Sequence, residues 1–238
     1  MSASSRALRP AAVFAGIPAV VVGVVLTVVL GWIAGVIALV VVAAGLMAWA
    51  RLAGDWMVAS RLGGRPADPR TDARLCNLVE GLSSGAGVRQ PRLVVVESSG
   101  LNALAAGTSG RKAVVAVTTA LLTELDRIEL EAVLALELWL IRRDEIVPAT
   151  VLAATFGLGR DLALEKDRDS RADQGAISIT RYPPALAAAL EKIDSKGSVV
   201  AGQPGWMSQL WLTDPRPGSV RDRGRLALTE RVEALREL

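Results

Sequence analysis

The sequence predicts an α+β fold, in which a two-helix transmembrane hairpin precedes a mainly helical domain with a small β-sheet. No charged side chain occurs between Ala11 and Ala50, a stretch rich in Val, Ala, Leu and Ile. A short β-branched run at Leu93–Val96 is typical of a strand. Most other apolar residues recur at helical spacing. With 238 residues, the chain is long enough for one domain of ordinary size and an appendage.

The uncharged stretch is twice as long as one membrane span, which needs about 20 apolar residues. We therefore expect two helices, at 11–30 and 33–50, with a tight turn near Gly31. A cleavable signal peptide is the alternative, but its apolar region covers only about 7–15 residues. Gly31 and Gly35 form a GxxxG pattern, which permits close contact either between the two hairpin helices or with a partner's helix.

Arginines on both sides of the hairpin predict its orientation. Arg6 and Arg9 precede the first helix, and the turn has no charge. Five arginines follow the second helix: Arg51, Arg61, Arg65, Arg70 and Arg74. The positive-inside rule then places both termini in the cytoplasm and makes the chain an integral protein of the cytoplasmic (inner) membrane, embedded in the lipid bilayer. A single cysteine, Cys76, suits that reducing compartment and excludes a disulfide framework.

Composition excludes several function classes. A chain that is 51% hydrophobic and 21% charged is not disordered as a whole. A net charge of +3 is too small for a dedicated nucleic-acid binder, so no nucleic-acid partner is expected. The chain has no histidine, which excludes Ser-His-Asp triads and histidine-ligated zinc.

Four regions follow from composition: a cytoplasmic tail (1–10), the hairpin (11–50), a Gly- and Pro-containing linker (51–72) and a cytoplasmic domain (73–238). The first half of the domain should contain, in order, a helix at 73–82, the strand at 93–96, a β-hairpin at 102–117 that turns at 107–110, and a helix at 118–124.

A central helix follows, and its apolar residues surround it almost completely, so it should be buried. Asp126 and Glu129 predict a capping box at its start, and it runs to Arg142–Arg143. The apolar run at 146–158 is short for a membrane span and is a core or interfacial helix. The rest of the chain should form a charged segment (160–174), a helix (184–193), a loop (195–205), an aromatic cluster (206–212) that is either core or a partner-docking segment, and a closing helix (226–238).

Several motifs of the domain follow one another in the order in which a known protein family has them. They are Asn102–Ala105, Val115–Leu122, Glu131–Leu140, Arg168–Asp173, Leu212–Pro215 and Glu230–Val232. Over residues 70–238 this order resembles the HtpX-like membrane zinc metallopeptidase family. That family has an Asn-Ala-Phe-Ala strand, a His-Glu-x-x-His helix, an Arg-Glu-x-x-Ala-Asp segment with the third zinc ligand, and a Thr-His-Pro segment. The resemblance implies a metallopeptidase-like (zincin-like) fold for the domain.

The departures from the family pattern concern the metal ligands. Leu136 and Leu140 stand at both histidine positions, Asp169 stands at the third-ligand position, and Asp214 replaces the histidine of Thr-His-Pro. Leucine has no lone pair for zinc. Glu137 keeps the general-base position, but without metal-bound water it has nothing to deprotonate. The resemblance therefore implies a degenerate member, a pseudopeptidase without catalytic residues, metal or other cofactor, in which Asn102 and Asp173 are further family-motif positions.

Three carboxylates leave a second possibility open. Glu137, Asp169 and Asp173 offer oxygen ligands that suit magnesium or calcium. The alternative that we favour is that they pair with nearby arginines, namely Arg142, Arg168 and Arg171. Glu137 lies in an apolar helix, and burial without a partner would cost several kcal/mol. It should therefore meet an arginine, reach water or be neutral.

The sequence thus predicts a catalytically inactive, membrane-anchored accessory, regulatory or scaffolding subunit of a membrane protein complex such as a transporter. One alternative is a metalloendopeptidase-like enzyme that uses a carboxylate metal site. Another is a peptide-binding module, in which the old substrate cleft holds an extended segment by strand addition near Asn102.

Overall fold

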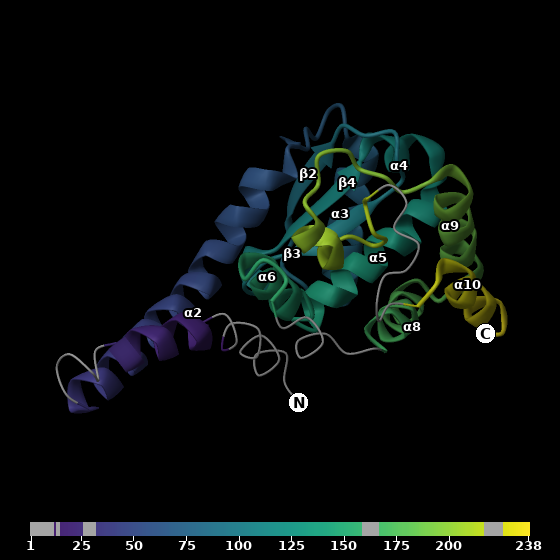
Figure 1. Cartoon of the computed structure of the whole chain (residues 1–238). Coiled ribbons are helices and arrows are strands. Elements are labelled where there is room, and N and C mark those ends of the chain that lie inside the picture. Colours follow the sequence, from purple (N-terminus) through teal and green to yellow (C-terminus); the bar gives the residue numbers. More distant parts are fainter. Residues whose placement is uncertain (1–11, 13–14, 26–31, 159–166, 217–225) are drawn as a thin grey trace.

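The computed structural model describes residues 12, 15–25, 32–158, 167–216 and 226–238. Within helix α2 (Trp32–Leu62), six side chains are also outside the description: Trp32, Met47, Ala50, Arg51, Ala53 and Asp55. The predicted tail at 1–10 and the turn at Gly31 lie outside the described residues. Figure 1 shows a mixed domain from which the first half of α2 projects, with the helical residues 15–25 beside it.

The two N-terminal helices pack through small residues. Ala15, Ala19 and Gly23 recur every four residues and are buried. A Cβ on Gly23 would lie 3.1 Å from Cβ of Leu39 and 3.3 Å from the carbonyl oxygen of Gly35, so the helices approach closely there. In the part of the chain that the structure describes, no helix has the combined length and hydropathy of a membrane span.

Helix α2 corrects the predicted linker, because it continues without a break to Leu62. Met57, Val58 and Leu62 are buried in the domain, which explains why the helix continues there. At Gly54 a Cβ would lie 3.1 Å from Cγ2 of Thr150, so α2 lies close against α6 (Ile146–Ala154). The Gly and charged residues that suggested a linker are compatible with a helix packed on one side.

A four-stranded mixed sheet lies at the centre of the domain, in the order β1-β2-β4-β3. Its strands are β1 (Arg65–Pro66), β2 (Arg92–Val96), β3 (Ala103–Ala106) and β4 (Val114–Thr118). β2 and β4 are parallel, and the outer pairings are antiparallel. The predicted strand and β-hairpin are confirmed. β1 was not predicted, because two residues that include a proline carry no strand periodicity.

Helices cover one face of the sheet and build the larger core. They are α3 (Ala73–Ala86), α4 (Thr119–Glu124), α5 (Arg127–Arg142), α8 (Arg168–Thr180), α9 (Pro183–Lys196) and α10 (Leu228–Arg236). α5 is central and buried, as predicted, and it packs against α3, α8, α9 and β3 (Figure 1). The capping box is confirmed: Oδ1 of Asp126 accepts from the Glu129 amide at 2.9 Å, and Glu129 accepts from the Asp126 amide at 2.8 Å.

A second core lies on the other face of the sheet, under α2, α6 and the 3₁₀ helix η2 (Gly205–Leu210). The predicted aromatic cluster at 206–212 contributes to it, with Met207, Leu210 and Trp211 buried. α6 is a core helix and is shorter than predicted. It ends at Ala154, because the backbone turns into the left-handed region just beyond it.

Helix α8 occupies the second half of the segment that the sequence marked only as charged, 160–174. Its buried face consists of alanines, a glycine and charged residues, so it has little of the apolar periodicity that predicts helices. On this helix, charged residues that tertiary contacts bury occupy positions where apolar residues would otherwise predict a helix.

Candidate functional site

The candidate site is the face of α5 that meets α8, where the resemblance places the metal ligands. Leu136 and Leu140 lie there, 2% and 4% exposed, and both are part of the larger hydrophobic core. Glu137 lies between them in sequence and is 1% exposed. The two leucines therefore fill the interior of the domain at the positions where the family resemblance calls for imidazole.

The contact between α5 and α8 is close because α8 presents small side chains. Ala172, Gly175 and Ala176 lie on its buried face. The ring of Trp139 occupies the space that a Cβ on Gly175 would need. Trp139 thus covers the crossing of the two helices and leaves no room for a larger residue at position 175.

Asp173 has both carboxylate oxygens engaged by Arg231. Nε of Arg231 donates to Oδ2 at 2.8 Å, and Nη2 donates to Oδ1 at 2.6 Å. This ion pair joins α8 to α10 inside the domain, and its arginine belongs to the motif Glu230–Val232 but was not among the predicted partners. Bidentate pairing leaves Asp173 unsuited to hold a cation.

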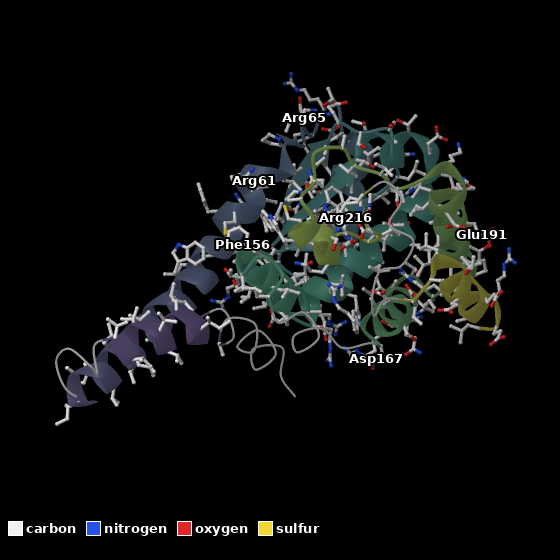
Figure 2. All side chains as sticks on the ribbon, viewed as in Figure 1. Arg61, Arg65, Phe156, Asp167, Glu191 and Arg216 are labelled. Atoms are coloured by element: carbon white, nitrogen blue, oxygen red, sulfur yellow. The ribbon has the colours of Figure 1, made fainter. Side chains whose placement is uncertain are left out.

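The two arginines of α8 hold it to neighbouring segments. Buried Arg168 donates from Nη1 to the carbonyl oxygen of Gln209 in η2 at 3.4 Å. Arg171 lies 3.4 Å from Oε1 of Glu145 and 3.1 Å from Oδ1 of Asp167. Asp167 is on the surface beside α8 (Figure 2). Asp169 is buried near them, on the same helix.

Asn102 joins three segments of the chain. Its Nδ2 donates to the carbonyl oxygens of Ser198 at 2.9 Å and Thr213 at 3.0 Å. Its Oδ1 accepts from the amides of Ala103 at 3.0 Å and Thr213 at 3.3 Å. Both ends of the side-chain amide are therefore used inside the protein, and the residue holds the segment after η2 against β3.

Asp214 is likewise engaged by a neighbouring arginine. Arg216, labelled near the middle of the domain in Figure 2, donates from Nε to Oδ1 at 3.0 Å and from Nη2 to Oδ2 at 2.6 Å. The position of the family's Thr-His-Pro histidine thus holds a paired carboxylate, which stabilises a turn of the chain.

The outer edge of β3 is partly occupied by the chain itself. Trp211 forms an antiparallel bridge with Leu104, and the Leu212 amide donates to the carbonyl oxygen of Ala103 at 2.7 Å. Trp211 is fully buried there. Sequence reasoning did not predict this pairing, although the apolar cluster at 206–212 was its signal. Strand addition of a foreign peptide at this point would require displacement of the chain's own segment.

These donors do not fit the zinc ion that the family resemblance implies. Leucine side chains at 136 and 140 offer no lone pair, and both are part of the larger hydrophobic core. Among the residues that the structure describes, no group of three or more His, Cys, Asp or Glu side chains could hold a metal ion. The residues at these positions instead form core packing and ion pairs.

Comparisons with known proteins identify the relatives of this chain. Residues 69–147 match the model of peptidase family M48. The chain is 31% identical to the protease HtpX homolog of Dictyoglomus thermophilum over an alignment of 188 residues, with 61% of this chain and 62% of that relative covered. The chain thus spans less than two thirds of that relative's length.

A second relative covers more of the chain. The protease HtpX homolog of Acidiphilium cryptum is 30% identical over an alignment of 230 residues, with 77% of this chain and 80% of the relative covered. The homolog of Streptococcus pneumoniae is 25% identical over 236 residues, with 76% and 79% covered. This similarity extends well beyond the matched segment 69–147, and the chain belongs to peptidase family M48, as a relative of the HtpX homologs.

Proposed function

We propose that this chain is a catalytically inactive, membrane-anchored member of its family that acts by binding, as an accessory or scaffolding subunit of a membrane protein complex such as a transporter. The observation that carries the proposal is the pair of buried leucines, Leu136 and Leu140, at the positions of the histidine ligands. The domain has the fold expected of family M48, but the side chains at the metal-ligand positions argue against zinc-dependent peptide hydrolysis.

The packing around the relic site supports this proposal. Leu136 and Leu140 are integrated in the larger core, and Trp139 closes the adjoining crossing with Gly175. Asp173, a further candidate ligand, is held by Arg231. A domain that keeps its fold while its donors are replaced by core residues is expected to be retained for what it binds.

Exposed apolar side chains support the proposed anchor. On the first half of α2, Val36, Ile37, Val40 and Val41 are each more than half exposed, although they are large and apolar. The helix at 15–25 repeats the pattern, with large side chains outside and small ones toward α2. Side chains drawn on residues 15–25 and on the first half of α2 in Figure 2 are almost entirely carbon. A surface of this kind is stable in contact with lipid or with another apolar helix. The arginine distribution then favours cytoplasmic termini.

Zinc analysis of the full-length chain tests the inactive state. We expect much less than one zinc per chain after expression with added zinc and dialysis against a weak chelator, and no cleavage of casein. The matched control is the triple variant Leu136→His, Leu140→His and Asp169→Glu, which restores the donor types of the family motif. About one zinc per wild-type chain that remains after dialysis would contradict the proposal.

A further inference from the structure

A polar groove of about 480 Å³ lies on the side of α5 that faces away from the relic site. Its lining comes from α3, α5 and the end of α8, and includes Arg127, Glu131 and Arg142 of α5. At 3.6 residues per turn, these three lie within about 60° of one another around the helix. Leu136 and Leu140 point to the other side, so the groove and the relic site are separate.

Three arginines line this groove with their charges unpaired among the described residues. Arg127, Arg142 and Arg181 are exposed, and none of their guanidinium groups forms a hydrogen bond or ion pair with any residue that the structure describes. Glu131 is the acidic residue of the lining. Arg171, Arg216 and Arg231, by contrast, are paired with carboxylates, so these three stand out as available positive charge.

Arg181 occupies an unusual backbone conformation at this place. It ends α8 with φ at +56°, in the left-handed region where glycine is the common residue. An arginine there costs more than a glycine would. Backbone preference therefore does not explain an arginine at this end of α8. The end of the helix borders the groove.

The wall formed by α3 is open enough for another helix. Gly81 and Gly85 line the groove one helical turn apart, and a Cβ at either position would meet nothing within 4 Å. Small residues at this spacing permit close approach of a second helix backbone. Arg127 and Arg142 are separated by 15 positions, or about 22 Å along α5, so the groove has the length of several helical turns.

We propose that this groove binds an acidic helical segment of a partner protein. Charge complementarity selects acidic side chains, and the glycine-lined wall with its length selects a helix. The groove lies on the α3–α5–α8 side of the sheet, whereas α2 packs against α6 on the opposite side. That separation from the apolar helices favours a protein segment over a lipid surface. The inference rests on the proposed binding function and specifies where a partner is held.

Binding of designed peptides to the full-length chain in nonionic detergent tests the groove. One fluorescent 18-residue helical peptide carries glutamates along one face, and an isomer of identical composition carries them all round. Fluorescence anisotropy at 50 mM salt should show saturable binding of the first peptide and at least tenfold weaker binding of the isomer. Raising the salt to 200 mM should weaken the binding, because exposed charges are then screened.

Two variants and a control locate the binding. Combined Arg142→Glu and Arg181→Glu should weaken it at least tenfold, and Gly81→Leu should do the same by filling the groove. Arg111→Glu, an exposed arginine on the 3₁₀ helix Gly110–Lys112, should change it less than twofold. Circular dichroism must show unchanged melting temperatures, and Gly85→Leu replaces Gly81→Leu if that variant is unstable.

Several outcomes would overturn the inference: equal binding of both peptides, an equal effect of Arg111→Glu, or no binding. Loss of binding to phosphatidylglycerol vesicles in the same variants, without an effect on the peptide, would assign the groove to lipid and contradict it as well. Zinc content of the same preparation separates this inference from the proposed function. A zinc-free chain that binds no peptide refutes the groove alone, whereas a zinc-loaded, casein-cleaving chain refutes the inactive state.

Discussion

Arg231 of α10 and Asp173 of α8 form a bidentate ion pair whose side chains are only 2% and 8% exposed. The pair ties the closing helix of the chain to the helix that carries the third-ligand position. Because both charges are removed from water, their mutual geometry determines whether the pair is tolerated. Because Arg231 engages both oxygens of Asp173, that carboxylate is not available as a metal ligand in the candidate site.

Removal of one partner should therefore be strongly destabilising. We expect Asp173→Ala to reduce the free energy of unfolding by about 3–5 kcal/mol, because it leaves Arg231 buried without its carboxylate. Urea unfolding followed by circular dichroism measures this change. The double variant Asp173→Leu with Arg231→Met should cost less than the single variant. A loss below 1 kcal/mol in Asp173→Ala would show that the pair contributes little to stability.

Gly175 should tolerate no side chain. A methyl group there would overlap the ring of Trp139, so Gly175→Ala must displace the ring or separate α5 from α8. Overpacking of this kind costs about 1–3 kcal/mol. Gly81→Ala is the matched control, because its Cβ meets open space in the middle of α3 and alanine favours helix by about 1 kcal/mol. Thermal unfolding should shift in opposite directions, and a neutral Gly175→Ala would refute this packing argument.

Much of this fold follows from local sequence patterns, and the parts that do not are held by distant contacts. The capping box at Asp126 and the strands β2 to β4 have strong local signals and were predicted. α8 was not, because its buried face carries Asp173 and small residues that depend on Arg231 and Trp139. The sequence pattern also predicts a linker where the C-terminal part of α2 lies, from residue 51 onward. The reason is the same, because this part packs against Thr150, a residue far away in the sequence.

The candidate site was likewise predictable only in part. Its motif positions were found from sequence, including Leu136, Leu140 and Glu137. The partners of the surrounding polar residues were not, because Arg231, Arg216 and Ser198 reach them through tertiary folding or turn geometry. Pairing between Trp211 and Leu104 also joins segments more than a hundred residues apart. Sequence motifs locate a site, but its hydrogen bonds depend on segments that no motif identifies.

Cys76 provides a test of topology and of its own burial. Burial raises the pKa of the Cys76 thiol, with a smaller contribution from Asp72 and Asp68. A raised pKa means less thiolate at neutral pH, and the thiolate is the reactive form. We therefore expect maleimide labelling in permeabilised cells to be slow at pH 7 and to become faster as the pH rises. Denaturation in urea should remove this delay.

In intact cells the same residue reports orientation. A domain on the cytoplasmic side should leave Cys76 unlabelled by a membrane-impermeant maleimide at any of these pH values. Cys76→Ser is the background control, and labelling after permeabilisation shows that the thiol is reachable. Rapid labelling of intact cells would contradict the proposed orientation and leave the pH dependence of the thiol as a separate result.

Glu137 distinguishes a relic from a working general base. Glu137→Gln keeps the size and hydrogen-bonding capacity of the side chain and removes its charge, so it separates proton chemistry from packing. In an inactive binding protein, the variant should leave the native-gel mobility of its membrane complex unchanged, because no proton is transferred at this position.

Stability has to be measured on the same preparation, since Glu137 is 1% exposed and its burial couples charge to folding. Loss of the complex together with a lower melting temperature would indicate a structural carboxylate, and Glu137→Met would then show whether an apolar residue of similar length restores stability. Loss of a cellular phenotype with normal abundance, an unchanged melting temperature and an intact complex would mean that the carboxylate performs chemistry, and the proposal of an inactive family member would be refuted.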